Sequence, residues 1–134
     1  MLTQIPFTAQ LTIVSGWYQE IEIDATGYTY FSITIPEKTI NVGLSHASNG
    51  ASSGSGRFHY RISNGSSKLE GSESEWFDAP LSGYVPVTIP EYTYQGPLNG
   101  NSIKISIDDN QEYIINYSWR LQGTPINITG YFRR

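Results

Sequence analysis

The sequence predicts an all-β protein: a single antiparallel β-sandwich or jelly-roll-like domain of about nine or ten short strands. Three observations support this fold class. Apolar and polar residues alternate with a period of two along most of the 134 residues, as they do in strands with one buried face. Turn-forming Asn, Asp and Gly residues separate the alternating runs. No window shows the 3.6-residue period of an amphipathic helix.

The first half of the chain holds three well-patterned runs, at 7–14, 17–24 and 28–35, and a weaker one at 39–45. Polar residues separate the apolar positions of each run, which predicts strands with one face in the core. The apolar positions are Phe7, Ala9, Leu11, Ile13, Trp17, Ile21, Ile23, Phe31, Ile33 and Ile35. A turn is expected over 24–27, where Asp and Gly suit turn geometry.

Four more clear runs lie further along the chain, at 57–63, 102–108, 112–119 and 125–132. Each alternates in the same way and predicts a half-buried antiparallel strand. Their apolar positions are Phe58, Tyr60, Ile62, Ile103, Ile105, Ile107, Tyr113, Ile115, Tyr117, Trp119, Ile126, Ile128 and Phe132.

Two local signals refine the prediction for the second half of the chain. Asp108-Asp109-Asn110 separates two clear runs, so we expect a hairpin over 102–119 that turns at these residues. The weaker run 84–89 contains Pro86. Proline cannot donate a ladder hydrogen bond, so this strand should lie at a sheet edge or a bulge.

The polar stretches 45–56 and 64–75 are rich in Ser and Gly or in Ser and Glu. We expect them to be long loops within one domain of residues 1–134, because the runs before 45 are too few for an independent core. The strand at 57–63 lies between them. It is either a core strand between two surface loops or part of a projecting arm that orders on a neighbouring subunit.

Composition excludes several classes of function. The chain has no cysteine, so disulfide and thiolate chemistry are ruled out. The net charge is −4 without a basic stripe, which argues against nucleic acid as a partner. No window approaches the length of an apolar membrane span, and the N-terminal residues lack the pattern of a signal peptide. We expect no membrane partner.

No residue pattern predicts catalysis, a metal or a cofactor. Gly50 to Gly54 matches G-x-S-x-G but lacks the strand-to-helix context of a nucleophile elbow. The two histidines, His46 and His59, are interpreted as a loop residue and a solvent-facing strand residue. The acidic residues Glu70, Glu73, Glu75 and Asp78 are interpreted as a solvated face. We therefore expect a protein that is not an enzyme.

Aromatic residues make up 13% of the chain and are its most informative feature. Most belong in strands and core, but alternation places several off the core face. These aromatics, together with the 57–63 strand, are the candidate interface residues. The full set is Phe58, Tyr60, Ile62, Trp17, Tyr18, Trp76, Tyr92 and Tyr94.

The runs 28–35 and 115–132, taken with the polar stretch 45–56, resemble small all-β virion proteins of tailed bacteriophages. The resemblance is to capsid cement or decoration proteins and to fibre or adaptor modules, and it covers the whole chain without a diagnostic motif. It implies a non-enzymatic structural protein of the virion that binds and stabilises the capsid lattice. The implied partners are the major capsid protein or other virion subunits, and further copies of the chain in a homotrimer.

Two alternatives stay open. Surface aromatics can stack on sugar rings, so the chain could be a carbohydrate-binding module or lectin with a glycan as its partner. It could also be a tail fibre or adaptor module. Binding to glycans, or to an intact particle, separates these interpretations.

Overall fold

The computed structural model describes residues 3–14, 20–47, 50–111 and 117–134. Within them the chain forms twelve strands. They are β1 (Ile5–Leu11), β2 (Glu20–Asp24), β3 (Tyr30–Ile35), β4 (Lys38–Ala47), β5 (Ser53–Asn64), β6 (Ser67–Glu73), β7 (Phe77–Pro80), β8 (Val85–Ile89), β9 (Tyr92–Pro97), β10 (Ser102–Gln111), β11 (Tyr117–Gln122) and β12 (Ile126–Arg133). The all-β prediction is confirmed.

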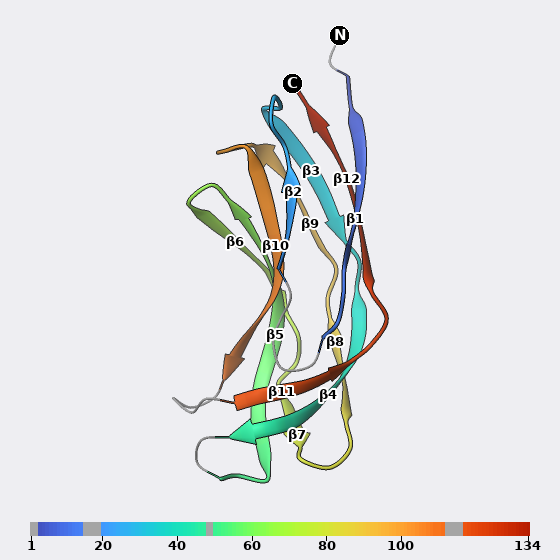
Figure 1. Ribbon diagram of the computed structural model, residues 1–134, viewed down its shortest axis with the longest axis vertical. Helices are drawn as coiled ribbons and strands as arrows, with labels where there is room; N and C mark the ends of the chain where they lie inside the picture. Colours follow the sequence, from blue (N-terminus) through green and yellow to red (C-terminus); the bar gives the residue numbers. More distant parts are fainter. Residues whose placement is uncertain (1–2, 15–19, 48–49, 112–116) are drawn as a thin grey trace.

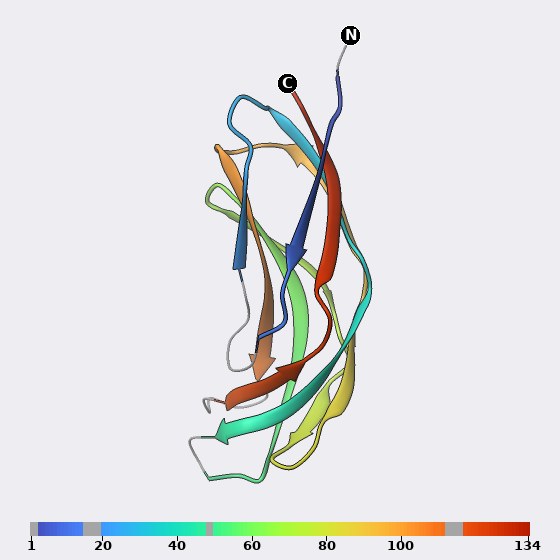
Figure 2. The same ribbon diagram turned by 45° about the vertical axis from the view of Figure 1, so that its right-hand side comes forward.

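All pairings are antiparallel, and they build three sheets (Figure 1). The first has the order β1-β12-β3-β9, the second β2-β10-β5-β6 with β7 also paired to β5, and the third β11-β4-β8. Each strand of the third sheet is adjacent in sequence to a strand of the first: β4 follows β3, β9 follows β8, and β12 follows β11. Figure 2 shows the first two sheets facing one another. The prediction of about nine or ten strands in one sandwich is therefore wrong in number and in sheet division.

The core lies between the sheets and consists mainly of the alternating apolar residues. Phe31, Ile33 and Ile35 of β3 are 0–1% exposed, and Ile103 and Ile105 of β10 are 0% exposed. These faces match the sequence prediction, because a period of two places alternate side chains on one side of a sheet.

The two predicted long loops are mostly strand, and that prediction is wrong. β4 extends to Ala47, β5 begins at Ser53, and β6 occupies Ser67–Glu73. Between β5 and β6 lies only a tight turn in which Gly65 has a φ of +62°. The projecting-arm hypothesis loses its basis, since β5 pairs with β10 on one side and with β6 and β7 on the other.

Packing explains why a Ser/Gly-rich stretch forms a strand here. Gly56 pairs with Phe77 of β7 and with Gln111 of β10. A Cβ atom on Gly56 would lie 3.1 Å from the Trp119 ring and 3.3 Å from the Phe77 ring. The small residue therefore makes room for large aromatic side chains, which supply the apolar burial that the stretch itself lacks.

The predicted 102–119 hairpin is also wrong. β10 continues without a break through Asp108, Asp109 and Asn110, all three of which pair with β5. β11 pairs with β4 instead. Asp109 accepts a 2.7 Å hydrogen bond from Trp119 Nε1, so its side chain links β10 to β11 without forming a turn.

Pro86 lies in β8, an edge strand that pairs with β4. This confirms the prediction that proline marks a sheet edge, because an edge strand has one side that needs no donor. β7 lies at the end of the molecule away from the N- and C-termini (Figure 1). In the part of the chain that the structure describes, no helix has the length and apolar character needed to cross a membrane.

Candidate functional site

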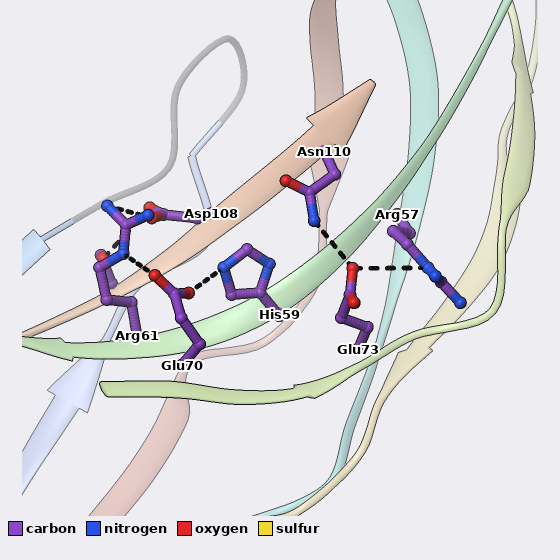
Figure 3. Close-up of polar contacts among 8 residues, drawn as sticks. Arg57, His59, Arg61, Glu70, Glu73, Asp108 and Asn110 are labelled. Carbon is purple, nitrogen blue, oxygen red and sulfur yellow. Dashed lines mark hydrogen bonds and ion pairs between the residues drawn. The ribbon is translucent and has the colours of Figure 1, made fainter. Parts of the chain in front are cut away.

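A cluster of charged and polar side chains covers the outer face of the β10–β5–β6 sheet (Figure 3). It arises from the residues that alternate with the core positions of β5. Phe58, Tyr60 and Ile62 point into the core and are 0–2% exposed. Arg57, His59 and Arg61 therefore project from the opposite face. Asp108 and Asn110 of β10 pair with His59 and Arg57 and add their side chains to the same face. We call these residues, with Glu70 and Glu73, the outer-face cluster.

A β-bulge brings both glutamates of β6 to this face. Glu73 pairs with His59 and Glu70 pairs with Arg61, so that two residues of β6 lie opposite the single residue Tyr60. The extra residue reverses the alternation of side chains between the two glutamates. Both carboxylates consequently contact β5 residues, Glu70 with His59 and Glu73 with Arg57.

Arg61 is the centre of one half of the cluster. Its Nε lies 2.8 Å from Glu70 Oε1, and its Nη1 lies 2.6 Å from Asp108 Oδ2. The other oxygen of Glu70, Oε2, contacts Nε2 of His59. One guanidinium thus holds two carboxylates from different strands in a fixed arrangement, which suits its fork of donors.

Asp108 and His59 are buried, although they lie on the face opposite the core. Asp108 is 6% exposed and His59 is 5% exposed. Burial raises the pKa of the Asp108 carboxyl above its ordinary value, and Arg61, His59 and a 3.3 Å hydrogen bond from Ser106 oppose that rise. Desolvation disfavours the charged form of the carboxyl group, whereas the ion pair with Arg61 favours it.

Glu73 organises the second half of the cluster. Its Oε2 accepts a 2.8 Å hydrogen bond from Asn110 Nδ2 and lies 3.6 Å from Arg57 Nε. Arg57 Nε also donates to the carbonyl of Ser74 at 3.1 Å. The Arg57 guanidinium lies over the ring of Trp76, 4.9 Å from its centroid.

The two halves line a common pocket of about 270 Å³. Its walls are His59, Arg61, Glu70, Gly71, Glu73 and Asn110. Two carboxylates, those of Glu70 and Glu73, and the guanidinium of Arg61 line it, so the lining has one excess negative charge when the imidazole is neutral. An arrangement of this kind can bind a cation or a small polar ligand.

The predicted interface residues that the structure describes lie in two environments. Phe58, Tyr60 and Ile62 lie in the chain's own core, where they are unavailable to a partner. That part of the interface prediction is corrected: β5 is paired on both sides, so its apolar face packs on the chain itself. Trp17 and Tyr18 lie outside the described residues.

The remaining three candidates lie nearer the surface. Trp76 is 50% exposed and is available for contact. Tyr92 and Tyr94 of β9 are partly buried and pack against the core. The Tyr94 ring lies 5.5 Å from that of Phe31, and Tyr92 packs against Gly71 of β6.

Sequence reasoning missed the outer-face cluster for three separate reasons. His59 was expected to face solvent, but neighbouring side chains bury it. Glu70 and Glu73 were expected in a solvated loop, but they lie on β6. Asp108 was expected in a turn, but it lies inside β10. The alternation of Arg57, His59 and Arg61 with apolar residues was the one signal that could have indicated a charged outer face.

Comparison with known proteins adds no relative: neither a protein-family model nor a curated protein matches the chain.

Proposed function

We propose that the chain is a non-enzymatic structural protein of a tailed-phage virion, of the capsid cement or decoration type. It would bind the major capsid protein or another virion subunit and stabilise the capsid lattice. One observation carries the choice of binding surface: large apolar side chains are exposed around the short strand β7. They are Trp76 at 50%, Leu81 at 47% and Tyr84 at 42% exposure. We call these three residues the β7 patch.

The β7 patch has the features of an adhesive surface. Trp76 directly precedes β7, and Leu81 directly follows it. The Arg57 guanidinium lies over Trp76, and the Arg120 guanidinium lies 4.6 Å from the centroid of the Tyr84 ring. Trp, Tyr and Arg are the residues that most often dominate the energy of protein interfaces. Rings that are already packed on one side lose little conformational freedom when a partner covers the other side.

The position of the patch also suits attachment to a lattice. β7 lies at the end of the molecule away from both termini (Figure 1). A chain that bound through this end would stand outward from the surface it decorates. The edge strands β1 and β9 of the first sheet could pair with neighbouring copies in a homotrimer, since unpaired edge amides accept an added strand.

The exposed rings also support a second candidate, a carbohydrate-binding module or lectin. The half-exposed Trp76 ring lies beside Arg57, whose neighbours Glu73 and Asn110 are polar. Sugar-binding sites combine an aromatic stacking surface with hydrogen-bonding groups of this type. The third candidate, a tail fibre or adaptor module, would use the same patch on a different virion component.

Particles from the organism that carries the gene provide the test. Purified chain is mixed with particles stripped of it, and the mixture is sedimented. We expect wild-type chain to sediment with capsids and to raise their resistance to heat, and the double variant Trp76→Ser with Tyr84→Ser to bind at least about 100-fold more weakly. Ile5→Ser is the matched control, because Ile5 is 39% exposed and lies on β1 rather than at β7.

Each result has a definite meaning. Binding to tails alone would support the fibre or adaptor candidate. Binding on a glycan array without binding to particles would support the lectin. Failure of wild-type chain to bind any particle component would overturn the virion proposal. If the double variant binds as wild type does, the β7 patch is not the contact surface.

A further inference from the structure

Three potential metal ligands of the outer-face cluster come together from three adjacent strands. They are His59 of β5, Glu70 of β6 and Asp108 of β10, and each offers a donor atom within 4.8 Å of the other two. Figure 3 shows the imidazole and the Glu70 carboxylate pointing toward one another, with the Arg61 guanidinium reaching both Glu70 and Asp108. One imidazole and two carboxylates form a ligand set that divalent transition metals accept.

His59 supplies the independent observation that a ligand belongs here. Its side chain is only 7% exposed. Among the described residues, neither Nδ1 nor Nε2 has a partner with hydrogen-bond geometry, although Nε2 contacts Glu70 Oε2. Buried polar atoms without such a partner are rare in folded proteins and call for a missing one. The ring also borders the 270 Å³ pocket, which is large enough for an ion and its water ligands.

We propose that His59, Glu70 and Asp108 bind a divalent transition-metal ion, for which Zn²⁺ is the probe. Arg61 then has a positioning role. It holds Glu70 through Oε1 and Asp108 through Oδ2. The oxygens that an ion would use are Glu70 Oε2, which contacts His59 Nε2, and Asp108 Oδ1, which accepts a hydrogen bond from the Ser106 hydroxyl. Groups that hold metal ligands in this way fix their orientation before the ion arrives. The ion also supplies the positive charge that the cluster lacks.

A bound ion would join β6, β5 and β10 across the outer face of one sheet. Its effect would therefore be on the stability of the fold, independently of which partner the β7 patch binds. Ligands must be deprotonated to bind a metal ion, so protons compete with the ion and binding should weaken in acid.

Calorimetric titration of the chain with Zn²⁺ tests the proposal. The chain must carry no polyhistidine tag and is first treated with a chelator. At pH 7.5 we expect one ion per chain, and a rise in Tm of about 5 °C or more when free Zn²⁺ exceeds the dissociation constant 100-fold. At pH 5.5 the affinity should be at least about 10-fold lower.

Variants assign the ligands. His59→Ala and Glu70→Gln should each weaken Zn²⁺ binding at least about 100-fold, and Glu70→Gln keeps the test valid if His59→Ala does not fold. His46→Ala is the matched control, because His46 is the other histidine and is exposed on β4. In ¹H–¹⁵N spectra, Zn²⁺ should shift the ring nitrogens of His59 and leave those of His46 in place.

The proposal is overturned if Zn²⁺ does not bind, or if it binds His59→Ala and wild type equally.

Discussion

Glu70 and Glu73 lie three residues apart on β6, yet both carboxylates contact residues on the same face of β5. In an unbroken strand, an odd spacing places two side chains on opposite faces. The bulge opposite Tyr60 removes this separation. It also turns Gly71 toward the facing sheet, where it packs against Tyr92.

Substitution of Gly71 tests the packing at the bulge. A Cβ atom would lie 2.6 Å from Tyr92 Cδ2 and 2.8 Å from its Cγ, so the ring or β6 must move. We expect Gly71→Ala to lower the free energy of unfolding by about 1–3 kcal/mol in urea denaturation. Gly100→Ala is the control, since its Cβ would meet nothing nearer than 3.8 Å. Equal stability of the two variants would contradict this account of the bulge.

Replacement of Phe58 tests its assignment to the core. Its ring lies 5.0 Å from that of Phe77 and 6.1 Å from that of Trp119. Phe58→Ala should lower the free energy of unfolding by about 3–5 kcal/mol, because it leaves a cavity among these rings. Trp76, which is half-exposed, provides the comparison. Trp76→Ala should lower the free energy of unfolding by less than about 1 kcal/mol. If the Phe58→Ala chain had normal stability and failed only to assemble, the core assignment would be wrong and Phe58 would be an interface residue.

Arg120 fastens the segment between β7 and β8. Its Nη2 donates to the carbonyls of Leu81 at 2.8 Å and Gly83 at 2.6 Å, and its Nε donates to that of Leu44 at 3.1 Å. We expect Arg120→Ala to lower the free energy of unfolding by about 1.5–3 kcal/mol and to increase hydrogen exchange over 81–84. Arg120→Lys should restore less than half of the free energy of unfolding that Arg120→Ala loses, because one ammonium group cannot reach the same set of carbonyls. Full recovery by lysine would show that charge alone suffices.

Tyr60 makes stability dependent on alkaline pH. The ring is 0% exposed, and its hydroxyl donates to the carbonyl of Pro36 at 3.0 Å. Burial raises the pKa of Tyr60. A raised folded-state pKa gives stability that is complete below the unfolded pKa of about 10 and is lost as the pH rises above it.

Tyr60→Phe should therefore lower the free energy of unfolding by about 1 kcal/mol at pH 7. Above pH 10, the stability of the variant should fall less steeply with pH than that of wild type. Urea denaturation at a series of pH values measures both effects. A variant with the same alkaline decline as wild type would place its origin elsewhere.

Asp24 makes stability dependent on acid pH, because its pKa is lowered whereas that of Tyr60 is raised. Its Oδ1 accepts hydrogen bonds from Thr26 Oγ1 at 2.7 Å and from Thr26 N at 3.1 Å, and these bonds lower its pKa below 3.8. The resulting stability is present above the unfolded pKa and is lost as the pH falls through the lowered one. In NMR titrations, Thr26→Ala should raise the pKa of Asp24 toward 3.8, and Thr26→Ser should preserve the lowered value. An unchanged pKa in Thr26→Ala would exclude the hydroxyl as its main cause.

Local alternation was sufficient to predict which faces of β3, β5 and β10 form the core. Ile62, Ile105 and Ile33 are all 0–1% exposed, as the period of two requires. Pro86 marked an edge strand because its missing donor is a property of the residue itself. Such features depend on a few neighbouring residues and can be read from the chain.

Features that depend on distant residues could not be predicted. Asp108 and Asn110 have turn-forming side chains, but Arg61 and Glu73 hold them in a continuous strand. The bulge in β6 has no sequence signature that separates it from a polar loop, because its effect appears only when β5 lies alongside. The outer-face cluster depends on both features, and this is why its three acidic residues were assigned to loops and turns.

The crowding at Gly56 also determines where the chain can vary over evolution. A Cβ atom on Gly50 would meet nothing within 4 Å, whereas six residues later Gly56 is pressed between Asn110 and two aromatic rings. Gly50 has a φ of +73°, which itself favours glycine, so substitutions should accumulate at the exposed Ser52 and Ser53 and be purged at Gly56. If the Ser/Gly-rich stretch 45–56 were treated as uniformly variable because of its simple composition, the tight steric restriction at Gly56 would be missed.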